Sequence, residues 1–280
     1  MKIAEFLPAI PNRLWDLAAQ IGVSHAICKC APDLTGLKAP DDFESLRVIQ
    51  ERFAERGFTL AGLEGDQFDM NRIKFGLPGR EADVERYRKM LENMGRLGIP
   101  LLCYNFMAGT GWHRNDTAFP LRGGALGSSF DLRTTPDTLT ESGALDKETL
   151  WENYAWFIEQ VMPAAEAAGV KMGLHPDDPP VDSLRGIARI MSSSEGIRRA
   201  LSMSSSPSHG LTYCQANFTL LGDADRSLLR EFRERVYFVH FRDVRGTAEC
   251  FHETFHDDGP TDMAAMIRLY REIGFEGPIR

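Results

Sequence analysis

The stretch VYFVHFRD, residues 236–243, carries the pattern from which the fold can be predicted. It is a short, nearly continuous apolar run that ends in polar residues, which is typical of a strand buried on both faces of a parallel sheet. Side chains alternate along a strand, so Phe238, His240 and Arg242 share one face, and the residues between them suit contact with outer helices. We therefore expect His240 and Arg242 to point inward.

The same unit recurs on both sides of this stretch. Other short apolar runs predict strands at Lys2–Leu7, His25–Cys28, Phe58–Glu64, Pro100–Phe106, Val170–His175 and Gly210–Cys214. Segments with helical spacing follow them, at Arg13–Ile21, Asp42–Arg56, Glu81–Leu97, Glu148–Ala168, Leu184–Met191, Asp223–Arg235 and Asp262–Ile273. We expect Asp41 to cap the second of these helices. Gly277–Arg280 then resembles the start of an eighth strand.

Alternation of buried strands and helices predicts an α/β fold, and the number of units favours a (β/α)₈ TIM barrel over a doubly wound sheet. The first strand is followed by FLPAIPNR, which lacks the G-x-G-x-x-G pattern of a dinucleotide-binding fold. No change in composition marks a second domain, so we expect residues 1–280 to form one barrel domain. The barrel is apparently cut off at the start of strand eight.

Read as units, the chain is one strand and one helix short of a complete barrel. An open barrel would leave the edges of its first and seventh strands unpaired, which natural proteins avoid. We therefore expect a C-terminal strand and helix that this sequence of 280 residues does not contain.

Composition and charge exclude several classes of function. The chain has 32 Lys and Arg against 40 Asp and Glu, a net charge of −8, with no basic stripe. This argues against a nucleic-acid partner and against docking on anionic membranes. No apolar run approaches the length of a membrane span. The five cysteines are odd in number and scattered, which fits a reducing cytoplasm; they are Cys28, Cys30, Cys103, Cys214 and Cys250.

Three candidate metal ligands stand at the ends of consecutive predicted strands. His175 ends the fifth strand, Cys214 the sixth, and His240 lies in the seventh. Active sites of such barrels lie at the carboxyl ends of the strands. A His–Cys–His set suits a borderline divalent ion, and three protein ligands leave positions open for substrate. Each residue alone reads more simply as a buried structural side chain; together they favour a metal site.

Polar residues near these strand ends are candidates for supporting roles. Asp177 and Asp178 can orient His175 from behind or contact substrate hydroxyls, or they can belong to a proline-rich structural turn. Arg242 can clamp a substrate carboxylate, or it can pair with Asp243 or another nearby carboxylate. Candidate substrate contacts are also Asn105 near the end of the fourth strand, and His256 and Asp257 in the polar segment Phe251–Met263; the alternative for this segment is a solvated loop.

The longest predicted loop runs from Met107 to about Asp146 and is rich in glycine. A loop of this kind after a barrel strand can act as a lid over the site. It can equally be a disordered insertion or an oligomer contact.

With these residues in place, the chain resembles the mannonate dehydratases, members of the xylose-isomerase-like barrel superfamily. The resemblance rests on four ordered stretches: LHPDDPP (Leu174–Pro180), YCQANF (Tyr213–Phe218), VYFVHFRDVRG (Val236–Gly246) and FHETFHDDGPTDM (Phe251–Met263). It implies dehydration of D-mannonate to 2-keto-3-deoxy-D-gluconate in hexuronate breakdown, with Mn²⁺ or Fe²⁺. The family's metal-binding His, Cys and His correspond to His175, Cys214 and His240.

The chain departs from the family pattern at several places. Ala216-Asn217 replaces the usual Gly-Thr, and the loop after strand four differs from better-known bacterial members. The family continues with an Arg-Pro-Asp-His motif and a later Tyr, and Arg280 corresponds to the Arg of that motif. The resemblance therefore implies that the main acid and base lie beyond Arg280, and we assign no catalytic residue within the chain.

Two other functions stay open on the sequence. One is a sugar isomerase or epimerase on the same barrel, although those enzymes usually bind metal through Glu, Asp and His without a Cys. The other is an inactive sugar-acid-binding relative. In each case we expect a small-molecule sugar acid or sugar as ligand and a homo-oligomer, a dimer or higher.

Overall fold

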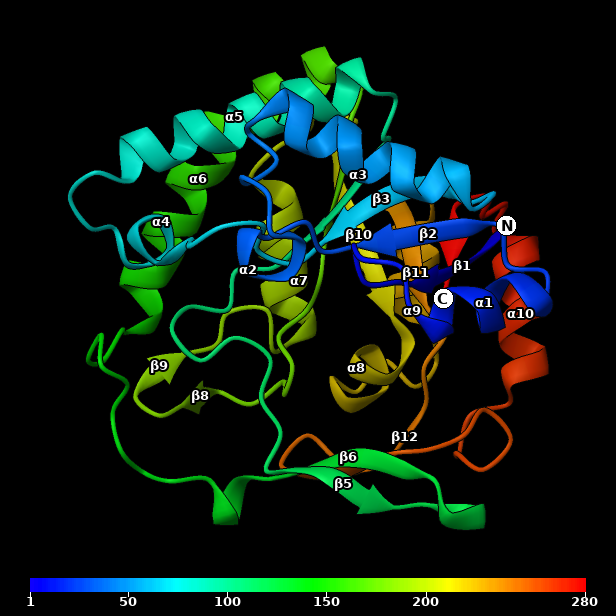
Figure 1. The fold of residues 1–280 in the computed structure, drawn as a ribbon. Coiled ribbons are helices and arrows are strands. Elements are labelled where there is room, and N and C mark those ends of the chain that lie inside the picture. The colour runs from blue at the N-terminus through cyan, green and yellow to red at the C-terminus, as the bar shows by residue number, and fades with distance from the viewer.

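Eight short parallel strands pair side by side into a closed barrel in the computed structural model, which describes residues 1–280 (Figure 1). In barrel order these are β1 (Lys2–Phe6), β14 (Pro278–Ile279), β11 (Val236–His240), β10 (His209–Cys214), β7 (Lys171–Leu174), β4 (Leu101–Tyr104), β3 (Thr59–Glu64) and β2 (His25–Cys28). Each strand predicted from the sequence is present within two residues of its expected bounds, apart from the seventh, which ends at His240, three residues before its expected end at Asp243. The predicted TIM barrel is confirmed.

The eighth strand consists of two residues, and they close the barrel. Lys2 and Ile3 of β1 pair with Pro278 and Ile279, and Val239 of β11 pairs with Ile279. The edges of β1 and β11 are therefore paired, unlike the open edges suggested by counting units.

Helices surround the barrel between the strands. They are α1 (Arg13–Gln20), α2 (Pro32–Thr35), α3 (Phe43–Glu55), α4 (Asn71–Phe75), α5 (Arg80–Arg96), α6 (Lys147–Ala168), α7 (Ser194–Ser202), α8 (Gln215–Leu220), α9 (Ser227–Glu231) and α10 (Met263–Glu272), with short 3₁₀ turns at Arg122–Gly124, Leu132–Thr134 and Arg233–Arg235. The cap of α3 is Asp42 rather than the expected Asp41, because the Asp42 carboxylate accepts from Ser45 N.

Two helix predictions are wrong. Residues 184–191 begin with a hairpin of β8 (Ser183–Leu184) and β9 (Ile187–Ala188), because Arg185 and Gly186 both take positive φ angles of 53° and 78°. The helix of this unit is α7, which follows the hairpin and is capped by Ser193 through a bond from Gly196 N. The predicted helix at 223–235 is reduced to α9 and a 3₁₀ turn.

The long loop after β4 is not irregular throughout. It contributes β5 (Asp116–Pro120) and β6 (Leu126–Asp131), and the segment after β11 contributes β12 (Val244–Thr247) and β13 (Cys250–Glu253). These strands form one antiparallel sheet in the order β12-β13-β6-β5, below the barrel in Figure 1. We call it the cap sheet. Part of the segment Phe251–Met263, which we expected to be a loop, is therefore strand.

Buried apolar side chains form three clusters. One of 58 residues lies between the strands and the outer helices, and one of six lies inside the barrel, with Phe238 among them. A third, also of six, includes Phe130 and Phe251 of the cap sheet. Val239 belongs to the outer cluster, so side chains of β11 alternate as expected. None of the helices has the length and apolar character that crossing a membrane requires.

Candidate metal centre and active site

A cavity of about 520 Å³ opens at the carboxyl ends of the barrel strands. Its wall combines strand-end residues with residues of the cap sheet, including Glu64, Asn105, His175, His240, Arg242 and Arg280 from the barrel and Ser128 and Glu253 from the cap. The sequence predicts the active site at this end of the barrel.

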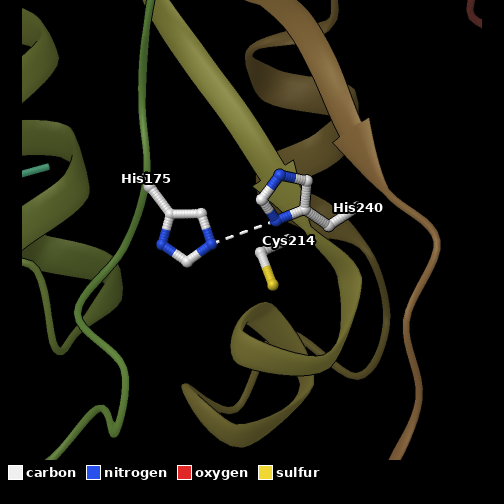
Figure 2. A group of neighbouring side chains, drawn as sticks. All are labelled: His175, Cys214 and His240. Carbon is white, nitrogen blue, oxygen red and sulfur yellow. Dashed lines mark hydrogen bonds between the residues drawn. The ribbon is translucent and has the colours of Figure 1, made fainter. Parts of the chain in front are cut away.

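His175, Cys214 and His240 meet beside this cavity (Figure 2). One ligand atom from each lies within 4.8 Å of the others. Cys214 and His240 are register partners on neighbouring strands, and His175 directly follows β7 on the other side of β10. The parallel register therefore brings the three side chains together.

The hydrogen bonds of the two histidines fix which nitrogens face each other. His175 Nδ1 lies 2.7 Å from the carbonyl oxygen of Pro176, so this nitrogen carries the proton and Nε2 is left with a lone pair. His175 Nε2 faces His240 Nδ1 at 3.2 Å. Burial lowers the pKa of His175, although Asp178 and Glu64 oppose this, and the neutral form is the one that binds metal.

The Cys214 thiol is fully buried and lies beside a guanidinium. Arg242 Nη1 is 3.5 Å from Sγ, and the thiol donates to Asn217 Oδ1 at 3.1 Å. Burial alone would raise the pKa of Cys214, but Arg242 and His240 outweigh it and the pKa is lowered. Two imidazole nitrogens and an activated thiol form a donor set that suits a borderline divalent ion.

Arg242 is held by protein carboxylates. Its Nε and Nη2 donate to the two oxygens of Glu253 at 2.7 and 2.6 Å, and Nη1 donates to Asp178 Oδ2 at 2.9 Å. The guanidinium therefore presents no free fork to a substrate carboxylate. The ion-pair alternative describes Arg242 better, with Asp178 and Glu253 as partners in place of Asp243.

Neither aspartate of the HPDDPP turn bonds the His175 ring. Asp178 accepts both Nη atoms of the buried Arg114, at 2.7 and 3.0 Å, as well as Arg242. Burial opposes ionisation of Asp178, but these two cations hold its pKa far below the usual range. Asp177 accepts from Met191 N at 2.7 Å, which makes it a support for the turn. Asp178 therefore influences the three candidate metal ligands indirectly, by holding Arg242 beside Cys214.

The other three expected substrate contacts lie in different surroundings. His256 lines the cavity, and its Nε2 lies 2.6 Å from the carbonyl oxygen of Phe241, so its Nδ1 is free to accept. Asn105 also lines the cavity. Asp257 is absent from the cavity wall; its carboxylate is exposed and pairs with Arg122.

Sequence reasoning missed Glu64, which lines the cavity at the end of β3. Its carboxylate pairs with Arg280, including a 3.0 Å bond from Nε, and lies 3.6 Å from His240 Nε2. Glu64, Cys103 and His240 also have ligand atoms within 4.8 Å of one another. The rule that selected His175 and Cys214, a polar residue ending a strand, would have selected Glu64 too.

Comparisons with known proteins show which family this chain is similar to. The model of the family D-mannonate dehydratase (UxuA) matches residues 39–142 and 135–280. A mannonate dehydratase of Streptococcus equi subsp. zooepidemicus is 34% identical over 238 residues, covering 74% of this chain and 65% of that protein. Mannonate dehydratase 2 of Halalkalibacterium halodurans is 31% identical over 267 residues, covering 85% of this chain and 77% of that protein.

A solved structure shows the same similarity in three dimensions. The crystal structure of mannonate dehydratase from Streptococcus suis serotype 2 matches with a TM-score of 0.87 and 27% sequence identity. The match covers all of this chain and 82% of that one.

Proposed function

The chain belongs to the mannonate dehydratase family of hydro-lyases, and from this premise we propose that its cavity dehydrates D-mannonate to 2-keto-3-deoxy-D-gluconate in hexuronate breakdown. The observation that carries the proposal is the meeting of His175, Cys214 and His240 at the cavity. Isomerases and epimerases of this barrel usually bind metal through Glu, Asp and His, so a cysteine in the donor set favours the dehydratase.

We infer that His175 Nε2, Cys214 Sγ and His240 Nδ1 hold Mn²⁺ or Fe²⁺. The donor chemistry fits, because a neutral imidazole offers a nitrogen lone pair to a metal ion and Arg242 favours the thiolate form of Cys214. A bound divalent ion acts as a Lewis acid that stabilises the negative charge developing on the sugar acid when the C2 proton leaves. Glu64 Oε2 lies 3.6 Å from His240 Nε2, so a proton on that nitrogen would face a carboxylate, and Nδ1 is the nitrogen left for the ion.

The remaining residues of the wall orient the substrate. His256 keeps its proton on Nε2 toward the Phe241 carbonyl, so Nδ1 accepts a hydrogen bond from a substrate hydroxyl. Asn105 offers its amide to another oxygen of the sugar acid. Asp178 holds Arg242 beside Cys214, and Arg242 favours the thiolate form of this side chain. The effect of both residues on turnover therefore passes through the thiolate.

An assay of sugar acids against sugars tests the proposal. The protein is treated with chelator, reloaded with Mn²⁺ or Fe²⁺, and offered D-mannonate and a set of ketoses, with formation of a 2-keto acid followed. We expect 2-keto acid from D-mannonate alone. Interconversion of ketoses without 2-keto acid would indicate an isomerase or epimerase. Binding of D-mannonate without turnover would indicate a binding relative.

We also propose a cytoplasmic location and a homo-oligomeric state. All five cysteines are unpaired in the structure, which suits a reducing compartment. Sedimentation of the purified protein measures the oligomeric state, and a monomer at micromolar concentration would contradict the second part.

A further inference from the structure

Lys74, on α4, is a buried lysine whose ammonium group reaches the wall of the cavity from behind. Its side chain is 1% exposed. Nζ donates to Asp66 Oδ2 at 2.7 Å, to Asn105 Oδ1 at 3.1 Å and to the carbonyl oxygen of Met107 at 3.3 Å. A lysine ammonium has three N–H donors, and each of them has an acceptor in the protein. Lys74 therefore has no donor left for a substrate.

These contacts determine the orientation of the Asn105 amide. Asn105 Oδ1 accepts from Lys74 Nζ and from Met107 N, both at 3.1 Å. Both partners are donors only, so an amide turned the other way would set its NH₂ group against two other donors. The Nδ2 group is the polar end that remains, and Asn105 lines the cavity.

The local fold holds this arrangement in place. Asn105 directly follows β4, whose last residue accepts a 2.7 Å bond from the backbone nitrogen of His175. The end of α4 is tied to α6, because Asn153 Nδ2 donates to the Lys74 carbonyl at 3.1 Å. Asn153 also packs so closely on Gly76 that a Cβ there would lie 2.5 Å from its Oδ1. Lys74 is thus fixed at both its backbone and its ammonium group.

We propose that Asn105 Nδ2 donates a hydrogen bond to a hydroxyl oxygen of the sugar acid, and that Lys74 is the positioning residue that keeps the amide in this orientation. The inference rests on the proposed function, in which His175, Cys214 and His240 hold the metal ion and the carboxylate end of the substrate lies toward that ion. Asn105, one strand away from His175, then faces a hydroxyl at C4, C5 or C6. Asn105 is a specificity residue in this scheme, and Lys74 acts through it.

Mono-deoxy substrates test the role of Asn105. The metal-loaded wild-type protein and Asn105→Ala are assayed with D-mannonate and its 4-, 5- and 6-deoxy derivatives. For the wild type we expect one derivative to lose roughly 10-fold or more in kcat/KM, the usual consequence of leaving a polar group of a site unpaired. In Asn105→Ala that difference should disappear, whereas the ratios for the other derivatives stay the same. Equal loss on all derivatives, or an unchanged pattern, would overturn the inference.

The role of Lys74 is tested by the same ratios. Lys74→Met should reduce the discrimination seen at that one hydroxyl and raise KM more than it lowers kcat, and Lys74→Arg should restore part of it. In Asn105→Ala the further change Lys74→Met should alter the ratios no more. Lys171→Met is the matched control, since Lys171 also donates to a carbonyl, that of Pro207 at 2.7 Å, but lines a different cavity.

The possible outcomes distinguish a failure of this inference from a failure of the proposed function. If the wild type forms no 2-keto acid from D-mannonate, the proposed function fails. If it does, but Lys74→Met keeps the full wild-type discrimination, Lys74 has only a structural role. Should Lys74→Met not fold, as thermal melting would reveal, the Asn105→Ala series alone decides whether the amide donates.

Discussion

Two groups of possible metal ligands share His240, and they differ in the cations beside them. On one side of the ring, His175 and Cys214 lie within 4.8 Å; on the other side, Glu64 and Cys103 do. Distances alone do not distinguish these groups. The Glu64 carboxylate is already paired with Arg280, whereas the histidine nitrogens of the first group face each other at 3.2 Å.

The two cysteines show the same contrast. Both are buried, but Arg242 beside Cys214 lowers the pKa of that thiol, whereas burial raises the pKa of Cys103 well above its usual value, with Glu64 adding to the effect. A thiolate binds metal and a thiol does not. The position of one arginine on each side of His240 therefore decides which group suits a divalent ion and which serves as a structural pair.

The largest effect is expected for Cys214→Ser. It removes the thiolate from the proposed metal set, and we expect metal affinity to fall by more than about 100-fold, since even outer partners of a metal site cost 10–100-fold. Metal content after dialysis and formation of 2-keto acid measure the effect. If metal content and turnover both survive, the contrast between the two groups is wrong.

Arg280→Met should mainly affect stability. Removing one partner of this partly buried ion pair leaves the Glu64 charge uncompensated and costs about 3 kcal/mol of unfolding free energy at pH 7, the low end of the range for buried pairs. Arg280 and His240 overcome the effect of burial and lower the pKa of Glu64, so the contribution of this pair is present above about pH 4.5 and is lost as the pH falls. Urea unfolding of metal-free protein should show the gap to wild type narrowing near pH 4.

A double variant tests the origin of that loss. In Glu64→Gln with Arg280→Met the uncompensated charge is absent, so stability at pH 7 should partly recover. Equal stability of the single and double variants would show that the carboxylate is not the cause.

His209 lies outside both groups and shows how a buried histidine without carboxylate or thiolate partners behaves. Its Nε2 is bonded by Tyr154 and Tyr104 at 3.2 and 3.1 Å. Burial, with the nearby Arg235, lowers its pKa to about 4. The unfolded chain takes up this proton near pH 6.5 and the folded chain does not, so unfolding free energy should fall by about 3 kcal/mol from pH 6.5 to 4.

His209→Gln should remove this part of the pH dependence, whatever its effect at pH 7. Unfolding free energies at half-unit pH steps for the two proteins provide the difference. Parallel curves would mean that His209 titrates normally.

The smallest effect is expected for Cys103→Ser, the same substitution as in the first prediction but in the second group. Cys103 is a protonated, buried side chain, so metal content should stay at the wild-type value. Unfolding free energy should fall by about 1 kcal/mol, the cost of a hydroxyl in an apolar place. Loss of metal in this variant would reverse the assignment of the two groups.

The sequence predicted what depends on local pattern. The positions of His175, Cys214 and His240 follow from where their strands end, because parallel strands bring such residues to one edge of the barrel. The supports of the centre depend on contacts between distant segments: Arg242 bonds Asp178, 64 residues away, and Arg114 bonds Glu253, 139 residues away. Spacing within one segment contains no signal for such pairs.

The same limit explains the cap sheet. Neither the loop after β4 nor the segment after β11 has a regular hydrophobic pattern long enough to predict strands, and each forms them against the other: Phe251 pairs with Phe130. Arg122–Asp257 and Arg114–Glu253 add ion pairs between the two segments. The cap sheet is formed by pairing between segments that are distant in the sequence, rather than by local strand propensity.

The cap sheet has a consequence for how the cavity exchanges its contents. Since β6 and β13 are hydrogen-bonded neighbours, the two segments that wall the cavity cannot swing apart one at a time without breaking that ladder. Entry and exit of a ligand then require either a joint displacement of the four strands or passage around their rim. Amide protons of Phe130 and Phe251 would accordingly exchange with solvent at matching rates, as members of one opening unit.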